Sequence, residues 1–138
     1  MSARYLLDTN HLGAAIAPVS QLRQRIAEDI RQGIRFGTCI AALCELEVGI
    51  RQTARPDAYR RQRDRLLTQV RIWPVELDLV DSFGAVRDEL RSRGRVLSHV
   101  DVVLAALARS MRLTILTTDR DFEALPDIAV ENWITSTS

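Results

Sequence analysis

Lysine is absent from this chain, and all 19 of its basic residues are arginines. Mechanisms that require a lysine amine are therefore excluded, including a phosphate-binding P-loop, a Schiff base and the Asp/Lys site of a receiver domain. Each arginine instead carries a planar guanidinium group that matches the geometry of phosphate and carboxylate groups. The formal net charge is only +1, so the overall charge by itself neither indicates nor excludes a nucleic-acid partner.

Cysteines and long apolar runs are also scarce. The two cysteines, Cys39 and Cys44, have neither metal-binding nor redox-motif spacing, and we expect both to be small buried residues in a reducing compartment. The first apolar run is interrupted by Asp8 and His11, so it fits neither a signal sequence nor a membrane-spanning helix. We therefore expect a cytoplasmic protein that does not enter membranes.

Hydrophobic patterning predicts one α/β domain over residues 1–138. The composition is 46% hydrophobic, and a chain of this length buries about two-thirds of its unfolded surface. Short β-like runs alternate with helical ones, which predicts a mostly parallel central sheet of about five strands flanked by helices. The predicted strands cover residues 4–8, 35–39, 71–75, 113–116 and about 128–130. The predicted helices cover residues 20–32, 41–53, 56–70, 79–90 and 99–111, with a further helical turn near residues 121–123.

Four acidic residues each lie within or at the end of an apolar run: Asp8, Glu45, Asp101 and Asp119. An isolated carboxylate in apolar surroundings is costly unless it is paired, hydrogen-bonded or bound to a cation. Three of the four fall at predicted strand ends or helix starts, and Glu45 lies one turn into a helix that follows a strand. Because the carboxyl ends of parallel strands meet along one edge of a sheet, we expect the four to converge there. Mg²⁺ and Mn²⁺ prefer oxygen ligands, so the pattern indicates a divalent-metal site.

Individual acids also have ordinary interpretations. Asp8 and Asp119 fit as helix N-caps, and the run from Ser98 to Asp101 fits a capping box. Asp121 competes with Asp119 for the fourth acidic position, because the two lie only two positions apart. The joint pattern, rather than any single residue, favours a shared site.

Four short runs together resemble the successive motifs of PIN-domain ribonucleases. They are residues 6–10 (LLDTN), 42–49 (ALCELEVG), 101–108 (DVVLAALA) and 116–122 (LTTDRDF). Each run is weak alone, but four in order at these intervals are specific, and the likeness extends from Tyr5 to Trp133. The small size and the spacing are most similar to VapC-type toxins of bacterial toxin–antitoxin pairs.

The resemblance implies a three-layer PIN-like domain and a Mg²⁺- or Mn²⁺-dependent endoribonuclease that leaves a 5′-phosphate and a 3′-hydroxyl. It implies that the same four acids form the catalytic, metal-binding quartet. Thr9, Asn10 and Thr117 match polar positions beside the metal, where they support its ligands or contact the substrate. The resemblance also implies an RNA substrate, a cognate antitoxin protein as partner, and a homodimer.

Departures from the family pattern are mild. Val48 stands where a bulkier, often aromatic residue is common, and His99 is unusual so close to the third acid. We interpret His99 as a surface or helix-start residue rather than a catalyst. Glu47, on the same predicted helix as Glu45, is interpreted as structural or solvent-facing.

Arginines are dense in the middle of the chain, at positions 51, 55, 60, 61, 63, 65 and 71, and again further on at 87, 91, 93 and 95. A solvated helix face and an electrostatic track for an RNA backbone both explain them. Asp57 and Asp64 alternate with the arginines, which weakens the case for a track of phosphate contacts alone.

Other functions leave different marks in a sequence. A phosphatase of the haloacid-dehalogenase kind would need a second aspartate where this chain has Asn10. A non-catalytic PIN-like RNA-binding module would be expected to lack at least one acid, and none is missing. A PIN nuclease that processes RNA without a toxin role stays open, because it would carry the same acids. A neighbouring gene for a small DNA-binding protein with a flexible tail would favour the toxin.

Overall fold

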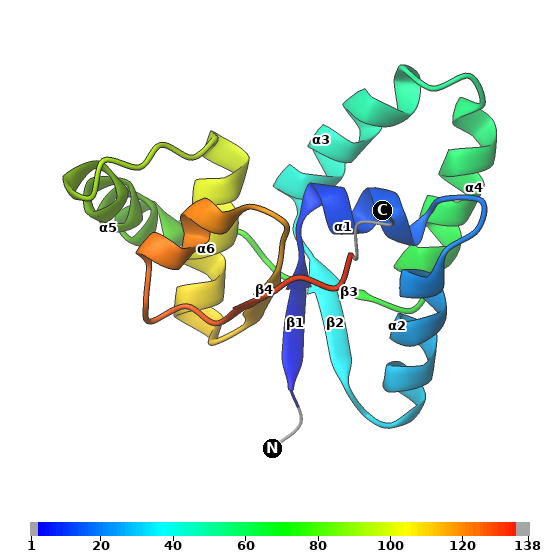
Figure 1. The fold of residues 1–138 in the computed structure, drawn as a ribbon, viewed down its shortest axis with the longest axis horizontal. Coiled ribbons are helices and arrows are strands. Elements are labelled where there is room, and N and C mark those ends of the chain that lie inside the picture. Colours follow the sequence, from blue (N-terminus) through cyan, green and yellow to red (C-terminus); the bar gives the residue numbers. More distant parts are fainter. Residues whose placement is uncertain (1–2, 135–138) are drawn as a thin grey trace.

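A five-stranded sheet forms the centre of the computed structural model, which describes residues 3–134 (Figure 1). Its strand order is β3-β2-β1-β4-β5, and every neighbouring pair is parallel. The strands are β1 (Arg4–Leu7), β2 (Arg35–Thr38), β3 (Arg71–Ile72), β4 (Thr114–Leu116) and β5 (Val130–Glu131). The predicted fold class, an α/β domain with about five mostly parallel strands, is confirmed.

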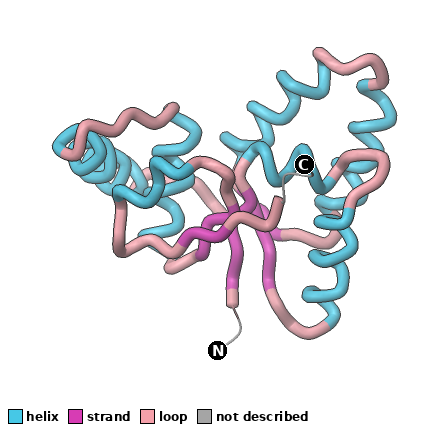
Figure 2. Tube along the Cα trace, in the orientation of Figure 1, coloured by secondary structure: helices cyan, strands magenta, loops and turns pink. Residues whose placement is uncertain are grey.

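Helices flank the sheet on both sides, with α5 and α6 on one side and α2 and α4 on the other (Figures 1 and 2). α3 and α4 form a helical arm that projects beyond the carboxyl ends of the strands (Figure 1). The helices are α1 (Thr9–Ala15), α2 (Gln21–Arg31), α3 (Ile40–Arg51), α4 (Pro56–Leu67), α5 (Leu79–Ser92), α6 (His99–Met111) and the 3₁₀ turn η1 (Arg120–Ala124).

The sequence pattern located every one of these elements except α1. That helix has only seven residues, a length that is marginal in isolation, and it depends on tertiary contacts. Its N-cap is Asp8, and it buries His11, Leu12 and Ala15. Helix α1 therefore forms because the core and the cap stabilise it, which periodicity alone does not reveal.

Two predicted strands are shorter or shifted in the structure. β3 ends at Ile72 rather than at residue 75, because Pro74 has no amide N–H to extend the ladder. β3 is an edge strand, as the proline predicted. β5 begins at Val130, because the amide of Ile128 donates to Leu125 O in a turn rather than to the sheet.

The buried core lies on both faces of the central strands. Leu6 and Leu7 point to opposite faces of β1, and both are fully buried. Burial on both faces is the pattern of a strand covered by helices on each side. The amide of Asp8 donates to Leu116 O at 3.1 Å, so the carboxyl ends of β1 and β4 are held side by side.

The structure also tests two further expectations, that both cysteines are buried and that no helix spans a membrane. Cys39 is buried, but Cys44 is exposed on α3, so the prediction that both are buried is wrong for Cys44. No helix in residues 3–134 combines the length and the apolar character needed to cross a membrane.

Candidate active site

Asp8 lies directly after the central strand, where it caps α1. Its Oδ1 accepts a hydrogen bond from the amide of His11 at 2.7 Å and lies 3.0 Å from His11 Nδ1. Both contacts involve Oδ1, and within residues 3–134 no protein group bonds to Oδ2. The predicted N-cap role is therefore correct, and it leaves the second carboxylate oxygen of a buried side chain available to another partner.

His11 is the residue at this site that the sequence analysis did not identify. It is fully buried, and its Nε2 accepts a hydrogen bond from the amide of Trp133 at 3.1 Å. An amide N–H can only donate, so Nε2 carries no proton and Nδ1–H donates to Asp8. The imidazole therefore fixes the orientation of the Asp8 carboxylate. Its position three residues after Asp8, on one face of a helix, was the available signal.

Asp101 lies in the first turn of α6, where Ser98 is the N-cap and accepts the Asp101 amide at 3.1 Å. Burial raises the pKa of the Asp101 carboxyl to about 6, and the Ser98 hydroxyl opposes that shift. The negative charges of three further carboxylates, Asp119, Glu45 and Asp8, add to the increase in that order. The structure thus brings the other three acids within electrostatic reach of Asp101, although the four come from four different segments.

Glu45 differs from the sequence-based expectation. We expected its side chain in apolar surroundings, but α3 buries Ala42, Leu46 and Ile50, and Glu45 lies on the exposed face. The helix is therefore amphipathic rather than apolar all round. Solvent, and not a partner within the core, accommodates the Glu45 charge in the absence of a cation.

Asp119 and Asp121 point to different neighbours. Asp119 Oδ1 accepts the amide of Asp121 at 2.9 Å, and the Asp119 charge acts on Asp101. The carboxylate of Asp121 instead pairs with Arg95 at 2.9 Å. Asp119 is also the N-cap of η1, as the sequence allowed. Of the two competitors, only Asp119 has a charge that reaches Asp101.

Three polar residues surround these carboxylates. Thr117 Oγ1 accepts the amide of Asp119 at 3.0 Å, which holds the turn after β4. Asn10 Nδ2 donates to Thr118 Oγ1 at 3.3 Å and links α1 to the same turn. Thr9 Oγ1 is buried and has no hydrogen-bond partner among the described residues, so one polar atom beside Asp8 stays unsatisfied.

Glu47 and His99 behave as the sequence analysis expected. Glu47 pairs with Arg60 at 2.9 Å and with Arg63 at 3.3 Å, and the hydrogen bond from Arg60 lowers the pKa of Glu47. These ion pairs join α3 to α4. His99 is exposed at the first residue of α6, and its ring lies 5.8 Å from that of Phe83.

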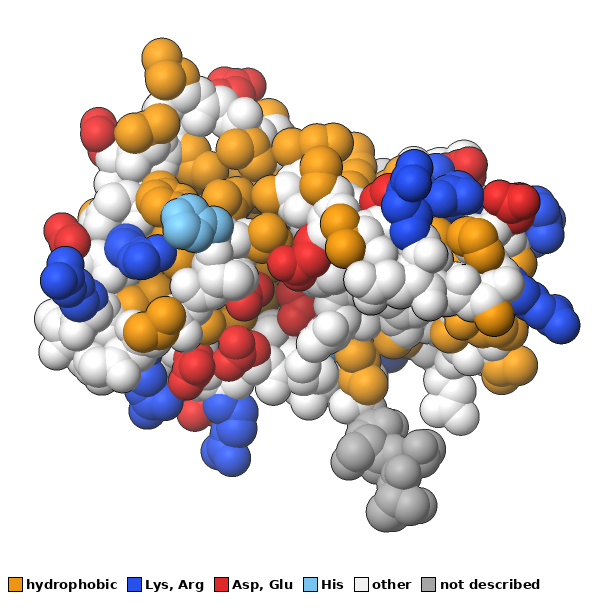
Figure 3. Space-filling model, turned by 90° about the horizontal axis from the view of Figure 1, so that it is seen from above, with side chains coloured by type: hydrophobic (Ala, Val, Ile, Leu, Met, Phe, Trp, Pro, Cys, Tyr) orange, Lys and Arg blue, Asp and Glu red, His pale blue; other side chains and the backbone are white. Residues whose placement is uncertain are grey.

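Acidic side chains gather in a central hollow on the face seen from above in Figure 3. We call the site of Asp8, Glu45, Asp101 and Asp119 the acidic site. Within residues 3–134, no three His, Cys, Asp or Glu side chains converge closely enough to form a ready metal cage. The donors nevertheless fit Mg²⁺ or Mn²⁺, because these ions take oxygen ligands, retain several waters and need only one or two carboxylates directly. Burial is the main cause of the raised pKa of Asp101, and repulsion from the other three carboxylates, which a cation would relieve, adds to it.

A parallel α/β sheet with carboxylates gathered at its carboxyl edge defines a class of proteins that bind ligands at the ends of their strands. The chain belongs to the PIN-domain family, whose model matches residues 5–128.

Individual relatives agree with this assignment. The chain is 35% identical to Ribonuclease VapC5 of Mycobacterium tuberculosis over 98 residues, which cover 69% of this chain and 72% of that protein. It is 23% identical to Ribonuclease VapC2 of Rickettsia felis over 94% of this chain and 97% of that protein. Among solved structures, VapBC2 from Rickettsia felis, bound to a DNA fragment from its promoter, has a TM-score of 0.83 at 22% identity. That match covers 95% of this chain and 99% of that one.

Proposed function

We propose that this protein is an endoribonuclease that depends on Mg²⁺ or Mn²⁺ and cleaves RNA phosphodiester bonds in the cytoplasm. Asp8, Glu45, Asp101 and Asp119 are its catalytic and metal-binding residues. The observation that carries the proposal is the gathering of acidic side chains in one hollow, where Asp119, Glu45 and Asp8 lie close enough to act on Asp101. Burial raises the pKa of Asp101 to about 6, and these three charges add to the increase. The names of the VapC relatives support RNA as the substrate.

The side chains around the acidic site have separable tasks. When bound, the metal would supply Lewis-acid stabilisation of the scissile phosphate and a water of lowered pKa. Asp8 keeps Oδ2 free for a metal, because both of its carboxylate contacts with His11 go to Oδ1. Thr117 and Asn10 hold the turn that carries Asp119 against α1. Glu45 contributes its charge from the exposed face of α3, where it is open to solvent and substrate.

We further propose that the ribonuclease is the toxin of a toxin–antitoxin pair and that it forms a homodimer. The support is the likeness to VapC ribonucleases and to the VapBC complexes of Rickettsia felis and Mycobacterium tuberculosis. An antitoxin arginine that enters the acidic site would replace the charge of the metal. Co-purification of a small partner from the native operon, and growth arrest when the chain is expressed alone, test the toxin role. Cleavage without either result would instead indicate an RNA-processing nuclease.

The nuclease activity is tested with purified protein and RNA. Cleavage should require Mg²⁺ or Mn²⁺, and undiminished cleavage in excess chelator would overturn the metal mechanism. Asp119→Asn should abolish cleavage, whereas Asp121→Asn on the same turn should retain it and lose only the Arg95 ion pair. Equal loss in both variants would contradict the choice of Asp119. RNA binding without any cleavage would indicate a non-catalytic module.

A further inference from the structure

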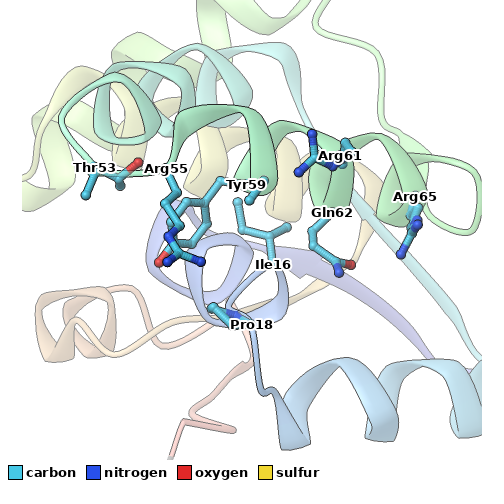
Figure 4. Close-up of a pocket in the computed structure, with 10 residues that line it drawn as sticks. Ile16, Pro18, Thr53, Arg55, Tyr59, Arg61, Gln62 and Arg65 are labelled. Atoms are coloured by element: carbon cyan, nitrogen blue, oxygen red, sulfur yellow. The ribbon is translucent and has the colours of Figure 1, made fainter.

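A second surface feature, separate from the acidic site, is a pocket of about 470 Å³ between α4 and the segment that follows α1 (Figure 4). We call it the arginine pocket, because three of its lining residues are Arg55, Arg61 and Arg65. Figure 4 shows the side chain of Arg55 extending from the arm toward the segment that carries Pro18, while Arg65 extends from the same helix farther along the pocket. The pocket therefore has cationic groups on one wall and an apolar segment on the other.

The arginines of α4 divide into two groups by their contacts. Arg60 and Arg63 both pair with Glu47 of α3, and each also pairs with an aspartate of α4, Asp57 and Asp64 respectively, so their charges are already compensated. Arg55, Arg61 and Arg65 have no carboxylate within ion-pair distance in the described residues 3–134. Arg61 and Arg65 are four residues apart and share a helix face. The structure thus distinguishes the arginines that join α4 to α3 through ion pairs from those whose charge is uncompensated. The sequence alone does not make this distinction.

The wall opposite the arginines is held in place without any ligand. The guanidinium of Arg23 donates to Ala15 O at 2.9 Å and to Ala17 O at 2.7 Å, which fixes the chain after α1. Ile16 is buried at the same place. A wall that is already ordered requires little reorganisation to bind a ligand.

Tyr59 adds an aromatic ring to the pocket lining, and Gln62 adds an amide. Both side chains are partly buried. Unpaired guanidinium groups favour phosphate oxygens, and an aromatic ring gives a stacking surface for an unstacked base. Single-stranded RNA offers both groups in one ligand.

Helix α1 connects the arginine pocket with the acidic site. Asp8 caps its first turn and Ile16 caps its last. The eight steps from Asp8 to Ile16 span about 12 Å at the rise of an α-helix. At about 3.4 Å of rise for each stacked nucleotide, this length corresponds to about four nucleotides of one strand. One RNA molecule can therefore reach both places.

We propose that the arginine pocket binds single-stranded RNA a few nucleotides away from the scissile phosphate. Arg55 and Arg65 contact backbone phosphates, and Tyr59 stacks on a base. The inference rests on the proposed ribonuclease function and gives its substrate a second point of attachment. The alternative occupant is an acidic segment of a protein partner, and RNA binding and partner binding by the same variants distinguish the two.

The test measures RNA binding directly and does not depend on cleavage. A fluorescent single-stranded RNA of about 12 nucleotides is titrated in chelator, and its anisotropy is followed at several salt concentrations. The variant R55A/R65A should bind more weakly. Its plot of log affinity against log salt should be less steep by about 1.4, because each lost phosphate contact removes about 0.7. Tyr59→Leu should lower affinity by about fivefold or more, and Tyr59→Phe should not.

The matched control is R87A/R91A, which removes two exposed arginines of α5 away from the pocket. If this control and R55A/R65A give the same affinity and salt slope, the pocket is not an RNA site. If R55A/R65A binds RNA normally but no longer holds the co-expressed partner, the pocket belongs to that partner and the proposal is overturned. If R55A/R65A has a lower melting temperature than wild type, the RNA titration is repeated with the single variant Arg65→Gln, which should also bind RNA more weakly. Absence of cleavage by wild type would refute the ribonuclease function, yet the binding result would still stand.

Discussion

At the scale of single residues, the acidic site is assembled from side chains in unlike environments. Asp8 is buried and oriented by His11, whereas Glu45 is exposed on the arm. Asp101 lies between these extremes, and burial together with neighbouring charge raises its pKa to about 6. The four acids are therefore not interchangeable, and substitutions should separate binding roles from structural ones.

Glu45→Gln should leave the stability of the metal-free protein level or raise it slightly, because it removes a like charge from the neighbourhood of Asp101. Cleavage should nevertheless fall by orders of magnitude, and stabilisation by Mn²⁺ should shrink. Thermal melts with and without Mn²⁺, paired with a cleavage assay, measure both effects. Glu47→Gln is the matched control on the same helix and should keep most activity. A Glu45→Gln protein with full activity would remove Glu45 from the site.

His11→Leu should lower the free energy of unfolding by about 1–3 kcal/mol, because it leaves the part-buried amide of Trp133 without its acceptor and removes the side-chain donor to Asp8, which keeps only the backbone amide of residue 11. It should also weaken the Mn²⁺-induced rise in melting temperature, since the Asp8 carboxylate loses its fixed orientation. Urea denaturation and metal-dependent melts are the measurements. His99→Leu alters the only other histidine and should be nearly neutral in both, because His99 is exposed. Equal effects at the two positions would contradict a positioning role for His11.

At the scale of elements, close packing at the outer strands decides how the sheet ends. β2 carries Gly37, and a Cβ at that position would lie 2.6 Å from Trp73 Cε2 and 2.8 Å from Arg71 O. The Trp73 indole covers this strand and donates to Tyr5 O at 3.4 Å. Only glycine therefore allows the indole and β3 to approach so closely.

Gly37→Ala should destabilise the protein by about 1–3 kcal/mol, because the new methyl group must displace either the indole or the β3 backbone. Gly84→Ala is the comparison, since a Cβ there meets nothing within 4 Å. Its helix should gain up to about 1 kcal/mol. Chemical denaturation with intrinsic tryptophan fluorescence reports both stability and the environment of Trp73. A Gly37→Ala protein as stable as wild type would show that the edge strand yields easily.

At the scale of the whole molecule, the apolar surface is not fully covered. Leu77 is 87% exposed and Val80 is 62% exposed at the start of α5. Figure 3 also shows a broad area of apolar side chains beside the acidic hollow. Contiguous exposed apolar surface is characteristic of protein–protein contacts, which agrees with the proposed homodimer.

Light scattering on the purified chain should give the mass of a dimer, and the variant L77E/V80E should shift it toward a monomer because charges oppose apolar burial. Val19→Glu, at a similarly exposed position after α1, should leave the mass unchanged. A monomeric wild-type protein would refute the homodimer. A dimer that resists L77E/V80E would place its interface elsewhere on the molecule.

Most helices and strands of this protein, and the candidate residues of its site, could be predicted from local sequence patterns. Hydrophobic periodicity and turn residues are local properties, so they located every helix and strand except α1. Carboxylates at the ends of apolar runs marked Asp8 and Asp119, because a strand end leads to the same sheet edge wherever it lies in the chain. Asp101 was marked by its place at the start of an apolar helix. The family resemblance depended on the same short runs.

Only the tertiary structure decided which groups meet. Asp121 turns to Arg95 while the charge of Asp119 reaches Asp101, and the arginines of α4 divide between Glu47 and an open pocket. His11 can orient Asp8 because the amide of Trp133, 122 positions away in the sequence, donates a hydrogen bond to its ring. Which side chains come into contact depends on how distant segments of the chain pack together. The spacing of residues along the sequence does not determine the distance between them in the fold. The exposure of Glu45 follows from the same cause, since the packed face of a helix is set by its neighbours.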